Sequence, residues 1–260
     1  MRIVAIVLCL VLALAACCQP AGSVSAPSRR VHLADNPFDI PVAASVNPDP
    51  RVGAIFLGGF DLHTCTGSVV HSSSGDLILT AAHCMAKQFN AVFVPGFANT
   101  AAPNNVWTVD AVYLDPLWVA ARDPRVDYAF ARVSRPTGGS IEAAVGSALT
   151  LGTAPAPGSQ ISVIGYPAQV GGTPIGCQNS TGVNPLGFPS FWCKGLVDGT
   201  SGSPWISGST VTGVTGGLQR GGCTQWVSYS APFNERTAAL LARAEAGGRG
   251  EAPPLAFLGC

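Results

Sequence analysis

The stretch Gly199-Thr200-Ser201-Gly202-Ser203-Pro204-Trp205 decides how the rest of the chain is interpreted. A glycine two positions before Ser201 and another directly after it let the backbone turn sharply and leave the serine hydroxyl exposed. The same turn can direct the amides of Gly199 and Ser201 at one point, where the oxyanion of a tetrahedral intermediate would lie. A cluster of Gly, Ser and Pro between two strands is more often an ordinary turn. The stretch therefore predicts a nucleophile loop only if the chain also supplies partners for the serine.

Two further residues are candidate partners for Ser201. A serine hydroxyl is a weak nucleophile at neutral pH and needs a base. His83 follows the apolar, strand-like run 77–82, so we expect the end of a rigid strand to carry it. Asp127 is a lone acid in the apolar run 125–130, where an unpaired carboxylate would be costly. Each residue alone also fits a structural role, but their order along the chain favours a catalytic triad.

These motifs together resemble the chymotrypsin-like (trypsin-like) serine peptidases, and are most similar to the secreted bacterial branch that includes glutamyl endopeptidases and streptogrisins. The resemblance covers about residues 52–245, and it rests on Cys65, Thr80-Ala81-Ala82-His83-Cys84, Asp127-Tyr128-Ala129 and Gly199 to Pro204. It implies an exported serine endopeptidase that forms an acyl-enzyme on Ser201 and needs no cofactor. His83 would be the general base, Asp127 would orient it, and the Gly199 and Ser201 amides would form the oxyanion hole.

Thr200 departs from the family pattern, because the animal enzymes carry Asp before the serine. Two other functions therefore remain open: a catalytically silent, peptidase-like binding protein, and an esterase-like acyl hydrolase with the same triad. In the animal enzymes that Asp pairs with an amine released by cleavage, for which Thr200 offers no charge. Arg51-Val52-Gly53 is typical either of a cleavable junction or of a loop before a strand. We expect an oxyanion hole held by neighbouring hydrogen bonds, and activity without processing.

The predicted fold is all-β. Gly 31 and Pro 21 among 260 residues suit short strands joined by turns. Strand-like runs recur at 64–70, 77–81, 91–94, 106–114, 126–133, 161–164, 211–214 and 226–229. Only 234–246 is typical of a helix, since it begins with Asn-Glu and ends before Gly247-Gly248. The resemblance implies two six-stranded antiparallel barrels, at about 52–135 and 141–246, with a C-terminal helix, a tail at 247–260 and the site between the barrels.

Composition and charge limit the classes of molecule that the protein is expected to bind. Hydrophobic residues make up 47% of the chain and charged residues 11%, which allows a large core. Lys plus Arg and Asp plus Glu number 14 each, so no net field attracts nucleic acid or an anionic membrane. We expect a monomer that acts on protein or peptide substrates.

The first residues indicate export. The apolar run Ile3 to Ala16 follows Arg2 and is shorter than the ~20 residues that span a bilayer, so residues 1–16 are interpreted as a signal peptide. Leu14-Ala15-Ala16-Cys17 resembles a bacterial lipobox, in which Cys17 would be lipidated and would anchor the protein to the membrane. The alternative is an ordinary cut within 13–16 and free secretion. Residues 17–51 would form a disordered tether or a propeptide.

Six cysteines remain after Cys9, Cys17 and Cys18 are assigned to the export signal. An even number in an exported chain indicates disulfides, and six cysteines allow 15 connectivities. The family resemblance implies a bond between Cys65 and Cys84, which would anchor the turn that carries His83. Position suggests Cys177 with Cys193, and elimination leaves Cys223 with Cys260. His63, Cys65, His83 and Cys84 include metal-ligand types, but adjacent strand residues point to opposite faces, so no metal site is predicted.

The residues that would line the specificity pocket lack a charged partner for the substrate. Trypsin-like enzymes that prefer Arg or Lys carry Asp six residues before the serine, and here that position is Gly195. Asp198 would lie nearer the rim of the pocket. The glutamyl enzymes place His in the strand that walls the pocket, and 211–217 contains none. We expect cleavage after an uncharged residue.

Overall fold

The computed structural model describes residues 40–58, 61–85 and 90–255, and the account below is restricted to them. The predicted signal peptide, Cys17, Cys260 and residues 17–39 of the predicted tether lie outside these ranges. None of the helices in the described ranges is long and apolar enough to cross a bilayer.

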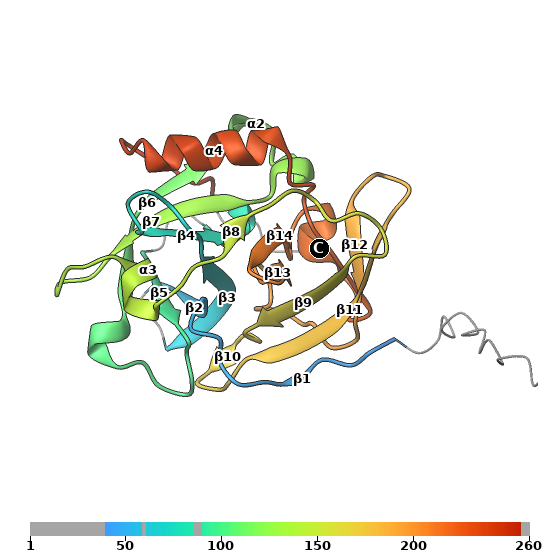
Figure 1. Ribbon diagram of the computed structural model, residues 1–260, viewed down its shortest axis with the longest axis horizontal. Helices are drawn as coiled ribbons and strands as arrows, with labels where there is room; N and C mark the ends of the chain where they lie inside the picture. Colours follow the sequence, from blue (N-terminus) through green and yellow to red (C-terminus); the bar gives the residue numbers. More distant parts are fainter. Residues whose placement is uncertain (1–39, 59–60, 86–89, 256–260) are drawn as a thin grey trace, which may run out of the picture. The chain divides into compact units, whose positions relative to one another are not determined.

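The first half of the chain forms a closed, six-stranded antiparallel barrel (Figure 1). Its strands pair in the order β3-β2-β5-β6-β7-β4, and β4 returns to pair with β3. The strands are β2 (Val52–Leu57), β3 (Leu62–Val69), β4 (Leu77–Thr80), β5 (Ala91–Pro95), β6 (Trp107–Leu114) and β7 (Ala129–Ser134). Register shifts at Ile55/Phe56 and Val109/Ala111 bend β2 and β6. Such bulges sharpen the curvature that closure requires.

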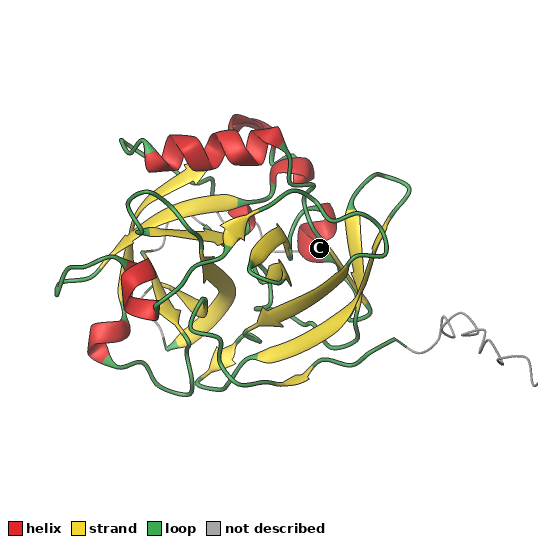
Figure 2. Cartoon of the chain, in the orientation of Figure 1, coloured by secondary structure: helices red, strands yellow, loops and turns green. Residues whose placement is uncertain are grey.

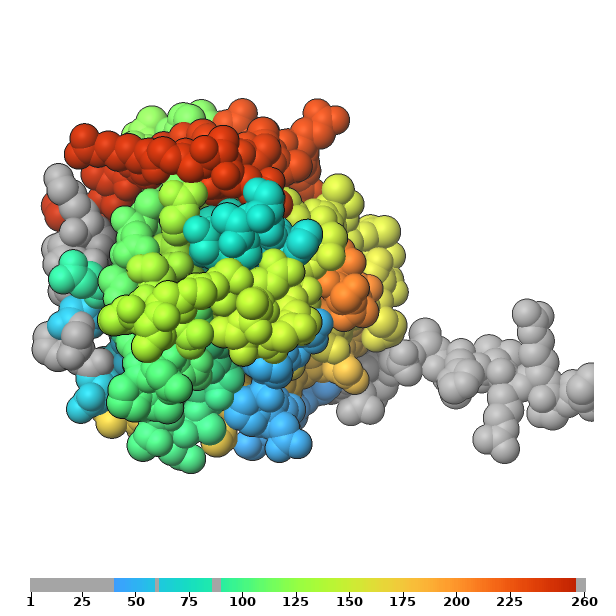
Figure 3. All heavy atoms as spheres, turned by 60° about the vertical axis from the view of Figure 1, so that its left-hand side comes forward, coloured from blue at the N-terminus to red at the C-terminus, as the bar shows by residue number. Residues whose placement is uncertain are grey.

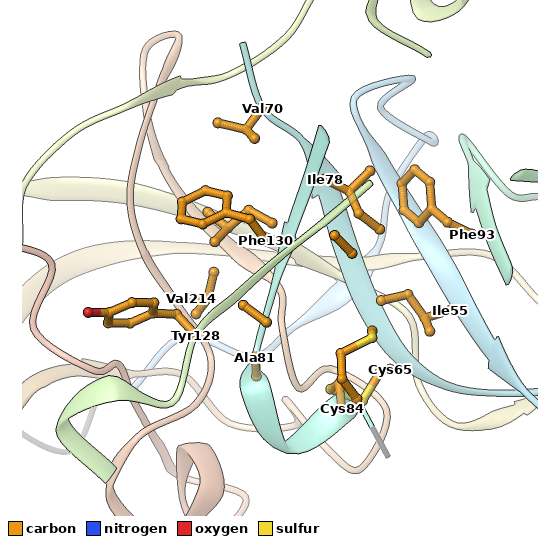
Figure 4. Packing of buried hydrophobic residues seen from close by; sticks show 14 of the residues in the cluster. Ile55, Cys65, Val70, Ile78, Ala81, Cys84, Phe93, Tyr128, Phe130 and Val214 are labelled. Atoms are coloured by element: carbon orange, nitrogen blue, oxygen red, sulfur yellow. A yellow bond between two sulfur atoms is a disulfide. The ribbon is translucent and has the colours of Figure 1, made fainter. Parts of the chain in front are cut away.

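Large apolar side chains fill this barrel. Ile55, Ile78, Phe93 and Phe130 have no exposed surface, and Figure 4 shows the cluster they belong to, with the Cys65–Cys84 disulfide at its lower edge. Gly53 makes room for Phe93, because a Cβ at Gly53 would lie 2.6 Å from that ring. Burial of such side chains contributes about 1.5–3 kcal/mol each, which makes this barrel a rigid support for the site.

The second half forms an eight-stranded sheet in the order β15-β12-β11-β9-β13-β14-β8, with β1 paired to β11. The strands are β1 (Ala44–Ser45), β8 (Thr150–Leu151), β9 (Gln160–Gly165), β11 (Ile175–Val183), β12 (Pro189–Trp192), β13 (Pro204–Ser207), β14 (Thr210–Val214) and β15 (Val227–Tyr229). A short strand, β10 (Gln169–Val170), instead joins β3 of the first barrel. Val163, Phe191 and Trp205 form the core of this half.

The second sheet differs from the predicted six-stranded barrel because it does not close. No strand pairing within the described residues joins its ends, β15 and β8, and β8 runs parallel to β14. The chain leaves β14 at a glycine pair, where Gly217 adopts φ 78°, a conformation that favours glycine. Two bonds then replace a strand ladder: the Gly216 amide donates to the Tyr229 carbonyl at 2.9 Å, and the Val214 amide donates to the Ser230 hydroxyl at 3.1 Å. The fold is thus a closed barrel beside a half-barrel.

The prediction that the fold begins at residue 52 is wrong. β1 pairs with β11 through Ala44 opposite Gly176, and the Ala43 amide donates to the Lys194 carbonyl at 2.8 Å. These contacts use backbone groups rather than an apolar face, so hydrophobic periodicity gave no sign of them. Residues 40–51 therefore belong to the folded domain.

Three α-helices and four 3₁₀ turns lie on the outside of the sheets (Figure 2). Their bounds are α2 (Pro116–Ala121), α3 (Ile141–Val145), α4 (Glu235–Glu245), η1 (Ala82–Cys84), η2 (Pro103–Asn105), η3 (Pro124–Val126) and η4 (Leu218–Gly221). The predicted C-terminal helix is confirmed as α4, and Asn234 caps it by accepting from the Arg236 amide at 2.9 Å. Figure 3 shows α4 along the top of the domain. There Arg132 donates to the Ala244 carbonyl at 2.8 Å, which fastens the helix to β7.

Candidate active site

His83 lies in a 3₁₀ turn rather than at the end of a strand. β4 ends at Thr80, and the amides of Cys84 and Met85 donate to the Ala81 and Ala82 carbonyls at 3.1 Å each. The disulfide between Cys65 of β3 and Cys84 of η1 fixes the turn to the barrel wall.

Asp127 is also presented by a turn and not by the strand that the apolar run predicted. Its φ of −76° and ψ of 62°, with a 2.8 Å bond from the Tyr128 amide to the Val126 carbonyl, define an inverse γ-turn. Three residues earlier the chain enters η3, whose first turn is capped by Asp123. β7 starts only at Ala129, so the carboxylate stands at the mouth of the barrel.

His83 and Asp127 form a closely bonded pair. The Nδ1–H of His83 donates to Asp127 Oδ2 at 2.7 Å, and the His83 amide donates to Oδ1 at 2.9 Å. The Gly217 amide adds a third bond, to Oδ2 at 2.8 Å. Only 6% of the His83 side chain and 1% of the Asp127 side chain are exposed. Because a carboxylate only accepts hydrogen bonds, Nδ1 carries the proton and Nε2 keeps its lone pair.

Ser201 and Ser203 lie in different surroundings. Ser201 is partly exposed, whereas Ser203 is fully buried and faces Gly165, where an added Cβ would lie 2.0 Å from the Ser203 hydroxyl. The turn at Gly202 passes close to the segment that carries His83, because a Cβ there would lie 3.1 Å from the Ala81 amide. Of the two serines, only Ser201 is placed where a substrate can reach it.

His83 Nε2 has no hydrogen-bond partner within the described ranges, and it shows no bond with the Ser201 hydroxyl. In peptidases without substrate this bond is often long, and it tightens when a substrate binds. The His83–Asp127 pair is thus oriented so that the lone pair of His83 Nε2 can accept a proton.

The two amides predicted to form an oxyanion hole are unpaired. The N–H groups of Gly199 and Ser201 donate to no other residue that the structure describes. Gly199 adopts φ 92°, and an added Cβ would lie 2.1 Å from the Ala168 amide and 2.6 Å from the Tyr166 carbonyl. Only glycine fits at this position. Thr200 is buried, and its hydroxyl donates to the Val197 carbonyl at 2.7 Å.

Comparison with known proteins identifies the family. The model of the trypsin-like peptidase domain matches residues 65–214, more than half of the chain. The chain belongs to the trypsin-like peptidase family. This membership makes it a hydrolase of the serine-type endopeptidase class. No curated protein shows significant similarity to the sequence.

Solved structures show that the chain has the trypsin-like peptidase fold. The protease Anisep from Arthrobacter nicotinovorans is 24% identical with a TM-score of 0.68, over 79% of this chain and 100% of that one. A thermostable serine protease from an extremophilic microorganism is 23% identical with a TM-score of 0.67, over 77% and 99%. A Glu endopeptidase is 17% identical with a TM-score of 0.62, over 80% and 98%. These likenesses show the fold.

The cysteines within the described part of this trypsin-like peptidase are all disulfide-bonded. Besides Cys65–Cys84, the structure contains Cys177–Cys193, which joins β11 to the segment before the nucleophile loop. Cys223 is disulfide-bonded as well, and its predicted partner Cys260 lies outside the described residues. The ligand atoms of Cys65, His83 and Cys84 lie within 4.8 Å of one another. Both sulfurs belong to the disulfide, however, and a metal needs thiolates.

His63, which the sequence offered as a further candidate metal ligand, lies apart from the site. Its ring contacts Phe56, Phe97 and Tyr166 edge-on, and Nε2–H donates to the Gly171 carbonyl at 2.8 Å. Burial lowers the pKa of His63, and the bond to that carbonyl opposes the shift only in part. It is therefore a neutral core histidine.

Two residues of the site were not predicted from the sequence. Gly217 acts on Asp127 through its amide, which every residue except proline carries. Thr66 contacts the nucleophile loop from β3, where a threonine is an ordinary strand former. Its place directly after Cys65 was the only feature of the sequence that could have indicated that Thr66 belongs to the site.

Proposed function

We propose that this trypsin-like peptidase is an exported endopeptidase that cleaves peptide bonds through an acyl-enzyme on Ser201. His83 is the general base and Asp127 holds its imidazole. The observation that carries the proposal is the 2.7 Å bond between His83 Nδ1 and Asp127 Oδ2, which leaves Nε2 as an unpaired base near the only accessible serine of the loop.

The reaction follows from this arrangement. The Ser201 Oγ attacks the carbonyl carbon of the substrate while its proton passes to His83 Nε2. The negative charge that develops on the carbonyl oxygen is stabilised by the Gly199 and Ser201 amides. Collapse of the intermediate breaks the C–N bond, and Nε2 returns the proton to the leaving amine. Water then repeats the sequence on the acyl-enzyme and releases the acid and the Ser201 hydroxyl.

Asp127 contributes by orientation and by charge. It fixes the tautomer in which Nε2 is basic, and it stabilises the imidazolium that forms in each half-reaction. The three donors to its carboxylate satisfy a buried charge that would otherwise be costly.

The disulfides support export, because such bonds persist in oxidising compartments. Within this proposal the substrates are proteins or peptides, cut after an uncharged residue, since neither Gly195 nor the exposed Asp198 provides a buried charge. The protein acts as a monomer, and Cys17 carries the lipid anchor. Intact-mass analysis of the native protein tests the anchor: a first residue before Cys17, or an unmodified Cys17, contradicts it.

Labelling with a serine-directed phosphonate tests the activity. We expect the protein to be labelled at Ser201 and to digest casein. Ser201→Ala should lose several orders of magnitude in kcat, whereas Ser203→Ala should keep most of the activity because the Ser203 hydroxyl has no hydrogen-bond partner among the residues that the structure describes.

The same experiment separates the alternatives. A folded protein that is not labelled would be a silent binding protein. Labelling with turnover of an aryl ester but not of casein would indicate an esterase. Loss of activity in Ser203→Ala with Ser201→Ala unaffected would contradict the assignment of the nucleophile.

A further inference from the structure

Thr66 of β3 makes an unusual number of contacts with the nucleophile loop. Its side chain is fully buried. Its hydroxyl donates to the Gly199 carbonyl at 3.0 Å, and its amide donates to the Ser201 carbonyl at 2.8 Å. The hydroxyl in turn accepts from the Tyr166 amide at 2.9 Å, which fixes the direction of its own proton. One residue of the first barrel thereby holds two peptide groups of the second half.

These bonds determine where the oxyanion donors point. In a trans peptide the C=O and N–H groups point in opposite directions. The Asp198 carbonyl accepts from the Ala168 amide at 2.7 Å, so the Gly199 N–H of the same peptide points the other way, toward the site. The Thr200 carbonyl accepts from the Ser203 amide at 3.0 Å, which aims the Ser201 N–H in the same manner.

The peptide between these two is held at both of its ends. It joins Gly199 to Thr200; its N–H donates to the Val197 carbonyl of the same loop at 3.0 Å, and its carbonyl is bound from outside the loop. Because glycine tolerates many backbone conformations, loss of the outer bond would leave only a bond within the loop to oppose rotation of this peptide. Rotation would turn the Gly199 carbonyl toward the site and displace both neighbouring N–H groups. The only side chain within the described residues that holds this carbonyl is Thr66.

Thr200 cannot fulfil this role. Its side chain is neutral, and its hydroxyl is engaged with the Val197 carbonyl on its own side of the loop. We propose that Thr66 is a positioning residue, whose hydroxyl keeps the oxyanion hole formed by holding the Gly199–Thr200 peptide. This inference rests on the proposed function, because it concerns the same oxyanion.

Thr66→Val tests the inference, because it removes the hydroxyl and keeps the shape. We expect kcat to fall roughly 10- to 100-fold with KM within about twofold, since the donors act on the transition state. Affinity for a peptide aldehyde, whose adduct with Ser201 carries the same oxygen, should fall in parallel. The pH at which kcat/KM is half-maximal should not move, because His83 and Asp127 are untouched.

Two companion variants separate positioning from stability. Thr66→Ser restores the hydroxyl and should recover kcat to within about threefold. Thr181→Val is the matched control, because Thr181 is buried and donates to a carbonyl, that of Ala156 at 2.8 Å, away from the loop. It should keep kcat even if it unfolds at lower temperature. Thr66→Ala removes the same hydroxyl and carries the same expectation if the valine variant does not fold.

Several outcomes would overturn the inference. They are an unchanged kcat in Thr66→Val, a loss confined to KM, a shifted pH profile, no recovery in Thr66→Ser, or an equal loss in Thr181→Val. Failure of the proposed function is distinct, because the wild-type protein would then show no phosphonate labelling and no turnover.

Discussion

At the scale of single residues, the site depends on positions where glycine has no side chain as well as on its functional side chains. Gly199 illustrates this, because its lack of a side chain lets the loop pass against Tyr166 and Ala168. Any Cβ would push the loop away from β9 and the segment after it. The two amides of the proposed oxyanion hole would move with it.

Gly199→Ala should therefore reduce kcat by about 100-fold or more, as removal of an oxyanion donor does. The control is Gly208→Ala, because Gly208 also has a positive φ, of 62°, but nothing lies within 4 Å of an added Cβ. That variant should lose only about 1 kcal/mol of stability and keep its kcat. The rate of phosphonate labelling measures the activity of each variant, and urea unfolding measures its stability. Equal kcat values for the two variants would contradict this explanation.

His63 should make the fold less stable in acid. Its pKa is lowered by burial, so the unfolded chain binds a proton more readily than the folded protein. The free energy of unfolding should therefore fall as the pH drops below about 6.5, the usual value for histidine. His63→Gln, which can keep the bond to the Gly171 carbonyl, should show a smaller loss of stability between pH 7 and pH 5.

His71 provides a control of opposite sign. It is exposed, and its hydrogen bond to Glu142 raises its pKa. His71 stabilises the fold at low pH and loses that effect as the pH rises through its pKa. Urea unfolding of His71→Gln should thus show a steeper loss in acid than the wild type. A His63→Gln variant with wild-type pH dependence would refute the first expectation.

The sequence singled out His83, Asp127 and Ser201 as candidate side chains of the site, whereas it did not indicate the backbone contacts around them. His83 and Asp127 stood out because histidine is rare in this chain and a lone carboxylate is costly in an apolar run, and Ser201 stood out because glycines flank it. Thr66 and Gly217 did not, because their contributions depend on which loop packs against them. That information lies in the tertiary structure and not in any local pattern.

At the scale of elements, residues 40–51, which precede β2, are an integral part of the folded domain. Val52 has no exposed surface and pairs with Ser68 in β3. The Arg51 side chain contacts Asp49 at 2.7 Å, and the Arg51 carbonyl accepts from the Val69 amide at 2.7 Å. The Arg51–Val52 bond is thus held within the fold, which fits a loop leading into a strand.

Blocking cleavage there should therefore leave the enzyme active. We expect Arg51→Gln, in the protein with residues 19–51 retained, to be labelled by the phosphonate at the wild-type rate. A protein that begins at Val52 should be less stable, because it lacks β1 and its pairing with β11. Labelling of the shorter protein alone would show instead that a new amine completes the site.

The Cys65–Cys84 disulfide, which joins β3 to η1, affects both stability and catalysis. Replacing Cys65 and Cys84 with serine should cost about 2 to 5 kcal/mol. It should also lower kcat, because η1 carries His83. Replacing Cys177 and Cys193 is the comparison, since it should cost stability with a smaller effect on the His83–Asp127 pair. Urea unfolding and kcat for both double variants decide this, and an undiminished kcat without Cys65–Cys84 would be the contrary result.

Strand prediction succeeded where apolar residues dominate and failed elsewhere. β4, β6 and β9 were expected within a residue or two of their observed ends. β11 carries Gln178, Asn179 and Ser180 at its centre and was missed, because its exposed outer face lacks an apolar alternation. β1 and β10 are two residues long and are held mainly by backbone pairing, which no apolar pattern reveals.

At the scale of the whole molecule, the two halves are interlocked rather than merely adjacent. β10 comes from the second half and pairs with β3 of the first barrel through Gln169 opposite His63. In the other direction, Thr66 of that barrel binds the nucleophile loop of the second half. The half-barrel thus gains from its neighbour part of the order that strand closure would have provided.

The bond from the Thr66 amide to the Ser201 carbonyl has a consequence for the life of the enzyme before it is mature. In the proposed mechanism the serine belongs to one half of the chain and the base to the other, so neither half alone would attack a polypeptide. Under the same proposal a newly exported chain, whose segments are extended and easily cut, would be harmless to itself and to its siblings until both halves have docked. Catalytic competence would then depend on completed folding, and autodigestion would be confined to molecules that are already compact.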